Sequence, residues 1–263
     1  SLIVFDMTFA EAGPDALADR ELARAIRDHG RVVLVADMES AGRNGIAGPR
    51  ILPPHDLFRA VTTNWGPMKA ESESDGVVRR IFRGTEQTPA VTWVAASLAD
   101  LPREISALGP PAATGHSISR GEPVVHAAAD HLAERWIRYY GPGRNLTHVS
   151  YSQATNQAPG FYRGKTIFIG GRPKTQLVGK EVDAFFTPWR LKGEPQISGL
   201  ELTATEFLNL SRDDYLTRLP ESGEFALLVC MGILAGAGLA SLRPGRAVLL
   251  AVAGVIAVLA ALA

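Results

Sequence analysis

The sequence predicts an α/β domain, with a mixed sheet and flanking helices, that is followed by a transmembrane α-helical hairpin. The α/β class follows from strand and helix patterns that alternate within residues 1–210. The hairpin follows from two uncharged runs, residues 225–242 and 247–263, which the stretch 243–246 joins. All 27 acidic residues and 25 of the 27 basic residues precede the first run, so a water-soluble head precedes an apolar end.

The start of the head follows a strand–helix–strand pattern. An apolar strand over residues 2–5 ends at Asp6, and Asp15 then caps a helix that stops at Gly30. A second apolar strand covers residues 31–36. Because two strands joined by a helix pair in parallel with a right-handed crossover, we expect a parallel β-α-β unit here.

Further elements are predicted by periodicity alone. Residues 77–82 and 166–170 have the composition of strands, and residues 88–101 and 199–210 have the spacing of amphipathic helices. The segment 126–140 is ambiguous, because its first part suits a helix and its last five residues alternate like a strand. These elements together predict a sheet with helices packed against it.

The two uncharged runs are long enough to cross a membrane. Eighteen helical residues span about 27 Å, close to the roughly 30 Å hydrocarbon core of a bilayer. Arg243 and Arg246 are the only charges in the short loop between the runs, and short basic loops remain in the cytoplasm. We therefore expect the lipid bilayer as a partner, the loop in the cytoplasm and the head outside, which in a bacterium is the periplasm.

Both ends of the sequence predict further membrane segments. Ser1 begins directly in an apolar strand, with no initiator methionine and no signal peptide. Ala263 ends the second run with no polar residue to anchor it at a membrane surface. We expect one span before Ser1 and another after Ala263.

Composition excludes several classes of function. Without Arg243 and Arg246, the head has 25 basic and 27 acidic residues and a net charge of −2, and it has no basic stripe for nucleic acid. The single cysteine, Cys230, lies in the first run, so the head has no disulfide and no thiol nucleophile. No sequence motif indicates a cofactor.

The sequence predicts neither a metal site nor a catalytic triad. His126 and Asp130 could share a helical face, but His131 is turned about 100° away from them. The stretch 115–119 lacks the last glycine of a nucleophile elbow. We therefore assign no catalytic residue and expect no enzyme in this chain.

Several short motifs occur in a characteristic order along the head. They are Asp6-Met7-Thr8-Phe9, Asp75-Gly76-Val77-Val78-Arg79-Arg80, Arg138-Tyr139-Tyr140-Gly141-Pro142, Ile167-Phe168-Ile169-Gly170, Asp183 and Gly199-Leu200-Glu201. Their order resembles that of the type-2 CHASE domain, an extracytoplasmic sensor module of bacterial signalling receptors, over residues 1–222. The resemblance implies one span before the sensor and usually three after it, which lead to a cytoplasmic cyclase or kinase. It departs at Thr203 and Thr205, where the family typically has histidine and asparagine.

The Asp75–Arg80 motif supplies the main candidate site. On a strand, one of Arg79 and Arg80 would lie among apolar neighbours, and an unpaired buried guanidinium is costly. One interpretation is an ion pair with a structural carboxylate such as Asp6, with Asp75-Gly76 as a turn. The other is an arginine fork for an anionic ligand. The candidate ligand-binding residues are Asp6, Asp75, Arg79, Arg80 and, from the resemblance, Glu201.

Small residues in the first run predict close helix packing. Gly232 and Gly236 are four residues apart and would let a second helix approach closely. The partner helix is either the second run of the same chain or, in a homodimer or larger membrane complex, another subunit.

Three functional hypotheses follow. In the first, the head is a sensor of a small-molecule or protein cue in the bacterial inner membrane, and it relays that cue to an output domain outside this sequence. In the second, the chain is a structural or accessory subunit of a larger membrane complex. The third, an anchored periplasmic hydrolase, has no nucleophile, metal set or carboxylate pair to support it.

Overall fold

The computed structural model divides the chain into two compact units, residues 1–217 and 218–263, which we describe separately. The structure describes residues 1–39, 50–85, 87–100, 134–141, 143, 145–171, 183–189, 196–246, 248–249 and 251–254.

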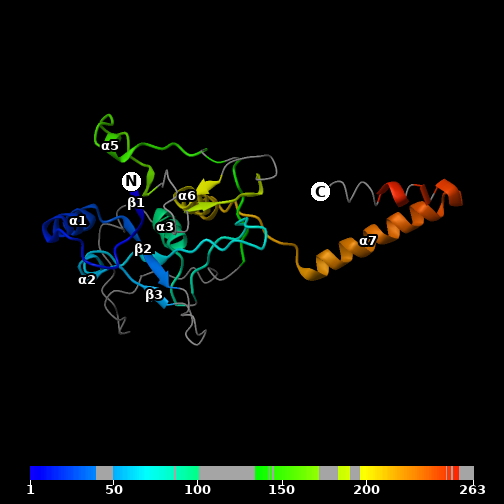
Figure 1. Ribbon diagram of the computed structural model, residues 1–263, viewed down its shortest axis with the longest axis horizontal. Helices are drawn as coiled ribbons and strands as arrows, with labels where there is room; N and C mark the ends of the chain where they lie inside the picture. The colour runs from blue at the N-terminus through cyan, green and yellow to red at the C-terminus, as the bar shows by residue number, and fades with distance from the viewer. Residues whose placement is uncertain are drawn as a thin grey trace, which may run out of the picture. The chain divides into compact units, whose positions relative to one another are not determined.

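The first unit is built on a mixed five-stranded sheet. Strand β1 (Leu2–Thr8) lies at its centre, between the parallel strands β2 (Val32–Glu39) and β5 (Thr166–Gly170). The antiparallel strand β3 (Arg50–Leu52) and the parallel strand β4 (Trp65–Pro67) both pair with β2. The predicted α/β class and mixed sheet are therefore confirmed (Figure 1).

The predicted β-α-β unit is confirmed down to its helix caps. Helix α1 (Ala16–His29) follows Asp15, whose side chain accepts hydrogen bonds from the amides of Leu17 and Ala18. The helix ends at Gly30, which has a φ of 72°, a left-handed conformation that glycine adopts without steric cost.

The sheet separates two layers of helices. Helices α3 (Val91–Asp100) and α6 (Gly199–Ser211) pack against one face of the sheet. That face carries Leu2 and Val4 of β1 and alternate residues of β2. The intervening residues of β1 face α1 and the short helix α2 (Asp56–Arg59) on the opposite side. Figure 1 shows α1 and α2 on one side of the strands and α3 and α6 on the other. This alternation points Asp6 toward the α3 and α6 layer.

The predicted strand over residues 77–82 is wrong. Val77, Val78, Ile81 and Phe82 are all buried, which a regular strand with one buried face would not allow. Instead, this segment forms single bridges with three different partners, residues 72, 186 and 136. Gly76, at a φ of 77°, turns the chain immediately before it. The segment therefore fills a second core beneath α6 and does not extend the sheet.

The predicted helices are confirmed with shifted ends. Helix α3 begins at Val91 because residues 84–90 form a turn in which the Thr85 amide donates to the Thr88 carbonyl at 2.8 Å. In the ambiguous segment, residues 126–133 lie outside the described part, and Trp136 pairs like a strand residue with Arg80 and Leu216. The remaining elements are α5 (Tyr151–Ala154) and a two-stranded ribbon, β6 (Ala184–Phe185) with β7 (Ile197–Ser198).

The second unit contains one helix, among the described residues, that is long and apolar enough to cross a membrane. This helix, α7 (Glu221–Ala240), begins four residues before the predicted span 225–242. A shorter apolar helix covers Pro244–Gly254, so most of the predicted loop 243–246 forms its first turn. Residues 247, 250 and 255–263 lie outside the described part, so the second span over 247–263 stays a prediction.

Candidate functional site

Asp6 lies at a position of the sheet where α/β proteins commonly bind ligands. It is near the carboxyl end of β1, and the chain continues from β1 to β2 on one side while β5 lies on the other. The strand order therefore reverses between β1 and β5. Ligands of open α/β sheets bind at the carboxyl ends of strands beside such a reversal.

Three elements converge tightly around Asp6. Gly170, at the end of β5, is the direct neighbour of Asp6 in the sheet. A Cβ atom on Gly170 would lie 3.1 Å from the Asp6 Cβ and 2.8 Å from Cδ1 of Leu200 on α6. Glycine here leaves room for Leu200 of α6 to lie close to the ends of β1 and β5.

Asp183 brings a second carboxylate to the same place. It packs against Gly199, the first residue of α6, where an added Cβ would lie 2.8 Å from the Asp183 Cγ. Asp183 retains exposure to solvent, but the protein around it still raises its pKa. Burial of part of the side chain is the main cause, and the Gly199 amide, which faces the carboxylate, opposes this effect without cancelling it.

The surroundings of Asp6 favour its neutral form. Burial, and then the negative charge of Asp183, raise the pKa of Asp6 to about 6. The Thr203 hydroxyl, which donates to the Gly199 carbonyl at 3.0 Å, also faces Asp6 and lowers its pKa without cancelling the effects of burial and Asp183.

A third carboxyl group, that of Glu206, is completely buried one turn further along α6. Neither of its oxygens has a hydrogen-bond partner among the described residues. Burial raises its pKa well above the ordinary value, and the charge of Asp6 adds to this effect. The Phe82 backbone and the Thr92 hydroxyl face Glu206 and oppose the shift, but neither is placed to form a hydrogen bond of ordinary geometry. The surroundings of Glu206 therefore favour its protonated form.

We call Asp6, Asp183 and Glu206 the carboxyl cluster. Asp6 is its centre, because its pKa responds to Asp183 and its charge acts on Glu206. The three side chains range from exposed at Asp183 to fully buried at Glu206.

The arginine motif forms a separate group. The Arg79 Nη1 lies 2.6 Å from Glu73 Oε2, and its Nη2 lies 2.6 Å from Asp75 Oδ2. Arg80 approaches Glu73 at 3.8 Å. The hydrogen bond with Arg79 holds the pKa of Asp75 at about 2. The carboxylates that pair with these arginines are thus Glu73 and Asp75, and not Asp6.

The remaining candidate, Glu201, faces a third direction. Its Oε1 accepts a hydrogen bond from the Asn145 amide at 3.3 Å. The structure thus groups Asp75, Arg79 and Arg80 around Glu73, and places Asp6 and Glu201 elsewhere. An anion-binding role for these residues stays a prediction.

A comparison with protein families extends over most of the chain. The CHASE2 domain family matches residues 1–238, which include the whole first unit and most of α7. The chain belongs to the CHASE2 domain family. CHASE2 domains are extracytoplasmic sensor modules and not catalytic domains. No curated protein and no solved structure matches the chain.

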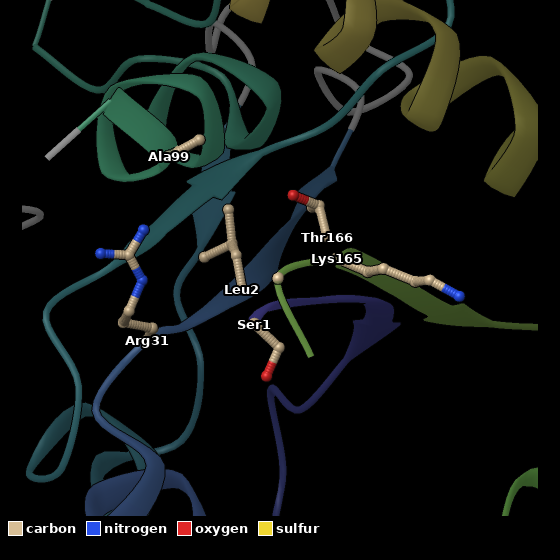
Figure 2. A pocket seen from close by; sticks show the side chains of 7 residues that line it. Ser1, Leu2, Arg31, Ala99, Lys165 and Thr166 are labelled. Carbon is tan, nitrogen blue, oxygen red and sulfur yellow. The ribbon is translucent and has the colours of Figure 1, made fainter. Parts of the chain in front are cut away.

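The CHASE2 head also has a cavity of about 270 Å³ at the amino ends of its parallel strands, at the opposite edge from Asp6. Arg31 donates from its Nη2 to the Leu98 carbonyl at 2.7 Å, and Lys165 lies over the Phe161 ring at 3.8 Å. Figure 2 shows the two cationic side chains extending away from each other. Because these two cationic side chains do not converge on one point, the cavity is a weaker candidate than the carboxyl cluster.

Within the described part of the CHASE2 head and α7, no group of three or more His, Cys, Asp and Glu side chains could hold a metal ion. His126, Asp130 and His131, which the sequence did not favour as ligands, lie outside the described residues, as does the stretch 115–119.

Sequence reasoning missed two members of the carboxyl cluster. Asp183 was noted only as part of a motif, because nothing in its local sequence indicates that it meets Asp6. Glu206 could have been found from helical spacing, which puts it on the same face of the predicted helix as Leu202 and Asn209. In the structure all three residues are fully buried. A charged residue on such a face is rare and marks a position that needs an explanation.

Proposed function

We propose that this chain is the extracytoplasmic sensor portion of a bacterial inner-membrane signalling protein. In this proposal the head, residues 1–222, lies in the periplasm and responds to a cue. The membrane helices relay the response to a cytoplasmic output domain. The family match carries the proposal, because it runs without interruption from the sensor head into α7.

The packing around α6 supports a physical route for the relay. Only residues 212–220 separate α6 from α7. Within this stretch, Leu216 exchanges two backbone hydrogen bonds with Trp136, at 2.8 and 2.9 Å, and Asp214 pairs with Arg138. A shift of α6 would therefore pull on residues 212–220, which the head already holds at Asp214 and Leu216. A transmitted conformational change requires such fixed contacts.

The buried polar contacts of α6 hold the same segment. Asn209, which is completely buried, accepts from the Arg138 amide at 2.7 Å and donates to the Arg138 carbonyl at 3.0 Å. Its Nδ2 also lies 3.1 Å from the Tyr140 hydroxyl. In this proposal, α6 and residues 136–140 move together.

The orientation can be tested by cysteine labelling. In a Cys230→Ala background, we expect Ser74→Cys in the head to react with a membrane-impermeant maleimide added to spheroplasts. Gly245→Cys in the basic loop should react only in inverted vesicles. The opposite pattern would place the head in the cytoplasm and reject the sensor topology.

The relay can be tested without knowledge of the cue. Residues 1–263 are fused through one added transmembrane helix, which returns the chain to the cytoplasm, to a histidine kinase output. One to four alanines are then inserted between Glu224 and Phe225. Each insertion rotates the rest of α7 by 100°, so kinase activity should vary with the helical period. The same insertions between Gln157 and Ala158, in an exposed turn, serve as the control. Constant activity across the α7 series would reject the relay and favour the accessory-subunit alternative.

A further inference from the structure

We propose that the carboxyl cluster is a proton-binding site through which the head responds to extracytoplasmic acidity. This inference rests on the proposed sensor function and names its cue. Four observations lead to it: the charges around Asp6, the hydrogen bond of Thr203, the unpaired burial of Glu206 and the contacts of the cluster with α6.

Among the described residues, the charge that acts on Asp6 is negative. Gly170 on β5 and Thr203 on α6 carry no charge, while Asp183 before β6 is an acid that raises the energy of an ionised Asp6. Arg79 is engaged by Glu73 and Asp75. An ionised carboxylate beside another carboxylate is stabilised by binding a proton.

Thr203 links Asp6 to the backbone of α6. Its hydroxyl donates to the Gly199 carbonyl at 3.0 Å and also faces Asp6, where it favours the carboxylate and is outweighed by burial and by Asp183. A hydroxyl can donate to an ionised Asp6 and accept from a protonated one. Thr203 therefore accommodates both protonation states of Asp6 and connects them to the first turn of α6.

Glu206 adds a second carboxyl group whose surroundings favour the protonated form. Its two oxygens are completely buried without hydrogen-bond partners among the described residues, and so is the hydroxyl of Thr92, which faces it from α3. The other groups that face it are the Phe82 backbone, Asp6 and the phenol of Tyr139, whose pKa is raised by burial and by Glu206. The Tyr139 hydroxyl donates to the Val78 carbonyl at 2.7 Å, so its proton is not directed to Glu206.

The cluster connects solvent to α6. Asp183 retains solvent exposure and contacts Gly199, while Asp6 faces Thr203 one turn further along the helix. When both aspartates ionise, their repulsion acts against the first turn of α6. Protonation of Asp6 removes that repulsion and tightens the packing of α6 on β1 and β5. In the proposed receptor, this change reaches α7 through residues 212–217.

Infrared titration of the full chain in lipid nanodiscs tests proton binding directly. We expect a protonated-carboxyl band at pH 7 that Glu206→Gln removes, and a second band that develops as the pH falls through about 6 and that Asp6→Asn removes. Asp183→Asn should move the second midpoint to lower pH, because it removes the neighbouring charge. Asp28→Asn, on the exposed face of α1, should change neither band. If no titration near pH 6 depends on Asp6 and Asp183, the proton site is rejected.

Hydrogen exchange of the same samples tests whether the proton acts on α6. After correction for intrinsic rates, we expect the protection of residues 199–217 to rise about tenfold from pH 7.5 to pH 5, through linkage to Asp6. Asp6→Asn should abolish this rise, and Asp28→Asn should preserve it. Titration of Asp6 without a change in protection would overturn acidity as the cue. The alanine-insertion series does not depend on pH, so the sensor proposal stands or fails separately.

Discussion

Replacing Asp6 with asparagine should stabilise the head at neutral pH and have no effect in acid. An aspartate whose pKa is raised in the folded state, from 3.8 to about 6, destabilises the fold wherever it must be ionised. That destabilisation is absent below pH 3.8, grows between 3.8 and about 6, and is complete above about 6. Asparagine has nearly the same shape, carries no charge, and can donate to the Thr203 oxygen.

The magnitude follows from the size of the shift. A shift of about two pKa units corresponds to about 3 kcal/mol at most. Because the side chain keeps a little contact with solvent, we expect Asp6→Asn to increase the free energy of unfolding by about 2 kcal/mol at pH 7.5. At pH 4 the gain should fall below about 0.5 kcal/mol.

Tryptophan fluorescence during urea unfolding measures this effect in the full chain. All four tryptophans, Trp65, Trp93, Trp136 and Trp189, lie in the head, so α7 contributes no signal. Asp28→Asn, the same chemical change on an exposed helix face, is the matched control and should stay within about 0.5 kcal/mol at every pH. A destabilised Asp6→Asn variant at pH 7.5, or a gain that does not depend on pH, would refute the reasoning.

Three further predictions use the same urea assay. Asp75→Asn should lower stability at pH 7, because Arg79 holds this carboxylate ionised, and the loss should fade as the pH falls toward about 2. The effect is thus opposite in sign to that of Asp6→Asn, and a loss that persists in acid would contradict the ion-pair explanation. Gly199→Ala should lower the free energy of unfolding by about 1–3 kcal/mol, because the added methyl group meets the Asp183 carboxylate. Gly171→Ala, where an added Cβ would have nothing within 4 Å, should be nearly neutral. Equal effects of the two substitutions would argue against the close contact at Gly199. Asn209→Ala should lower the free energy of unfolding by about 2–4 kcal/mol, because its buried hydrogen bonds with Arg138 are lost. The control Asn156→Ala, at an exposed position, should change it by no more than about 0.5 kcal/mol.

The parts of the fold that depend on local chemistry could be predicted from the sequence. The caps of α1, Asp15 and Gly30, act on amides and carbonyls only a few residues away, so their residue types are sufficient evidence. The same holds for β1 and β2, where short apolar runs lie on either side of one helix. Parallel pairing then follows from the handedness of the crossover.

The segment 77–82 shows where such reasoning fails. Its residues have the composition of a strand, but its backbone partners come from three separate positions, 72, 136 and 186. Periodicity records which side chains are buried and carries no information about which backbone groups are available to pair. The ion pairs of Arg79 were missed for a related reason, because Glu73 meets it only through the turn at Gly76.

The carboxyl cluster depends on contacts between residues far apart in the chain. Asp6 ends a strand that was predicted, and Glu206 lies on a helix that was predicted. Their proximity, however, requires β5 to lie beside β1 and α6 to pack across both. Gly170 and Gly199 permit that packing, and a glycine in a sequence does not indicate which element approaches it.

The departure of this chain from the family pattern fits a proton-binding role for carboxyl groups. Thr203 and Thr205 occupy positions where the resemblance implies histidine and asparagine, and each threonine donates to a backbone carbonyl four residues earlier, Gly199 and Glu201. A histidine at position 203 would place a cation beside Asp6 and lower the pKa of that carboxyl. With threonine there, burial and the charge of Asp183 raise the pKa of Asp6, and the threonine hydroxyl lowers it only in part. Thr203→His should therefore move the Asp6 midpoint well below 6, and an unchanged midpoint in the infrared titration would contradict this account of the cluster.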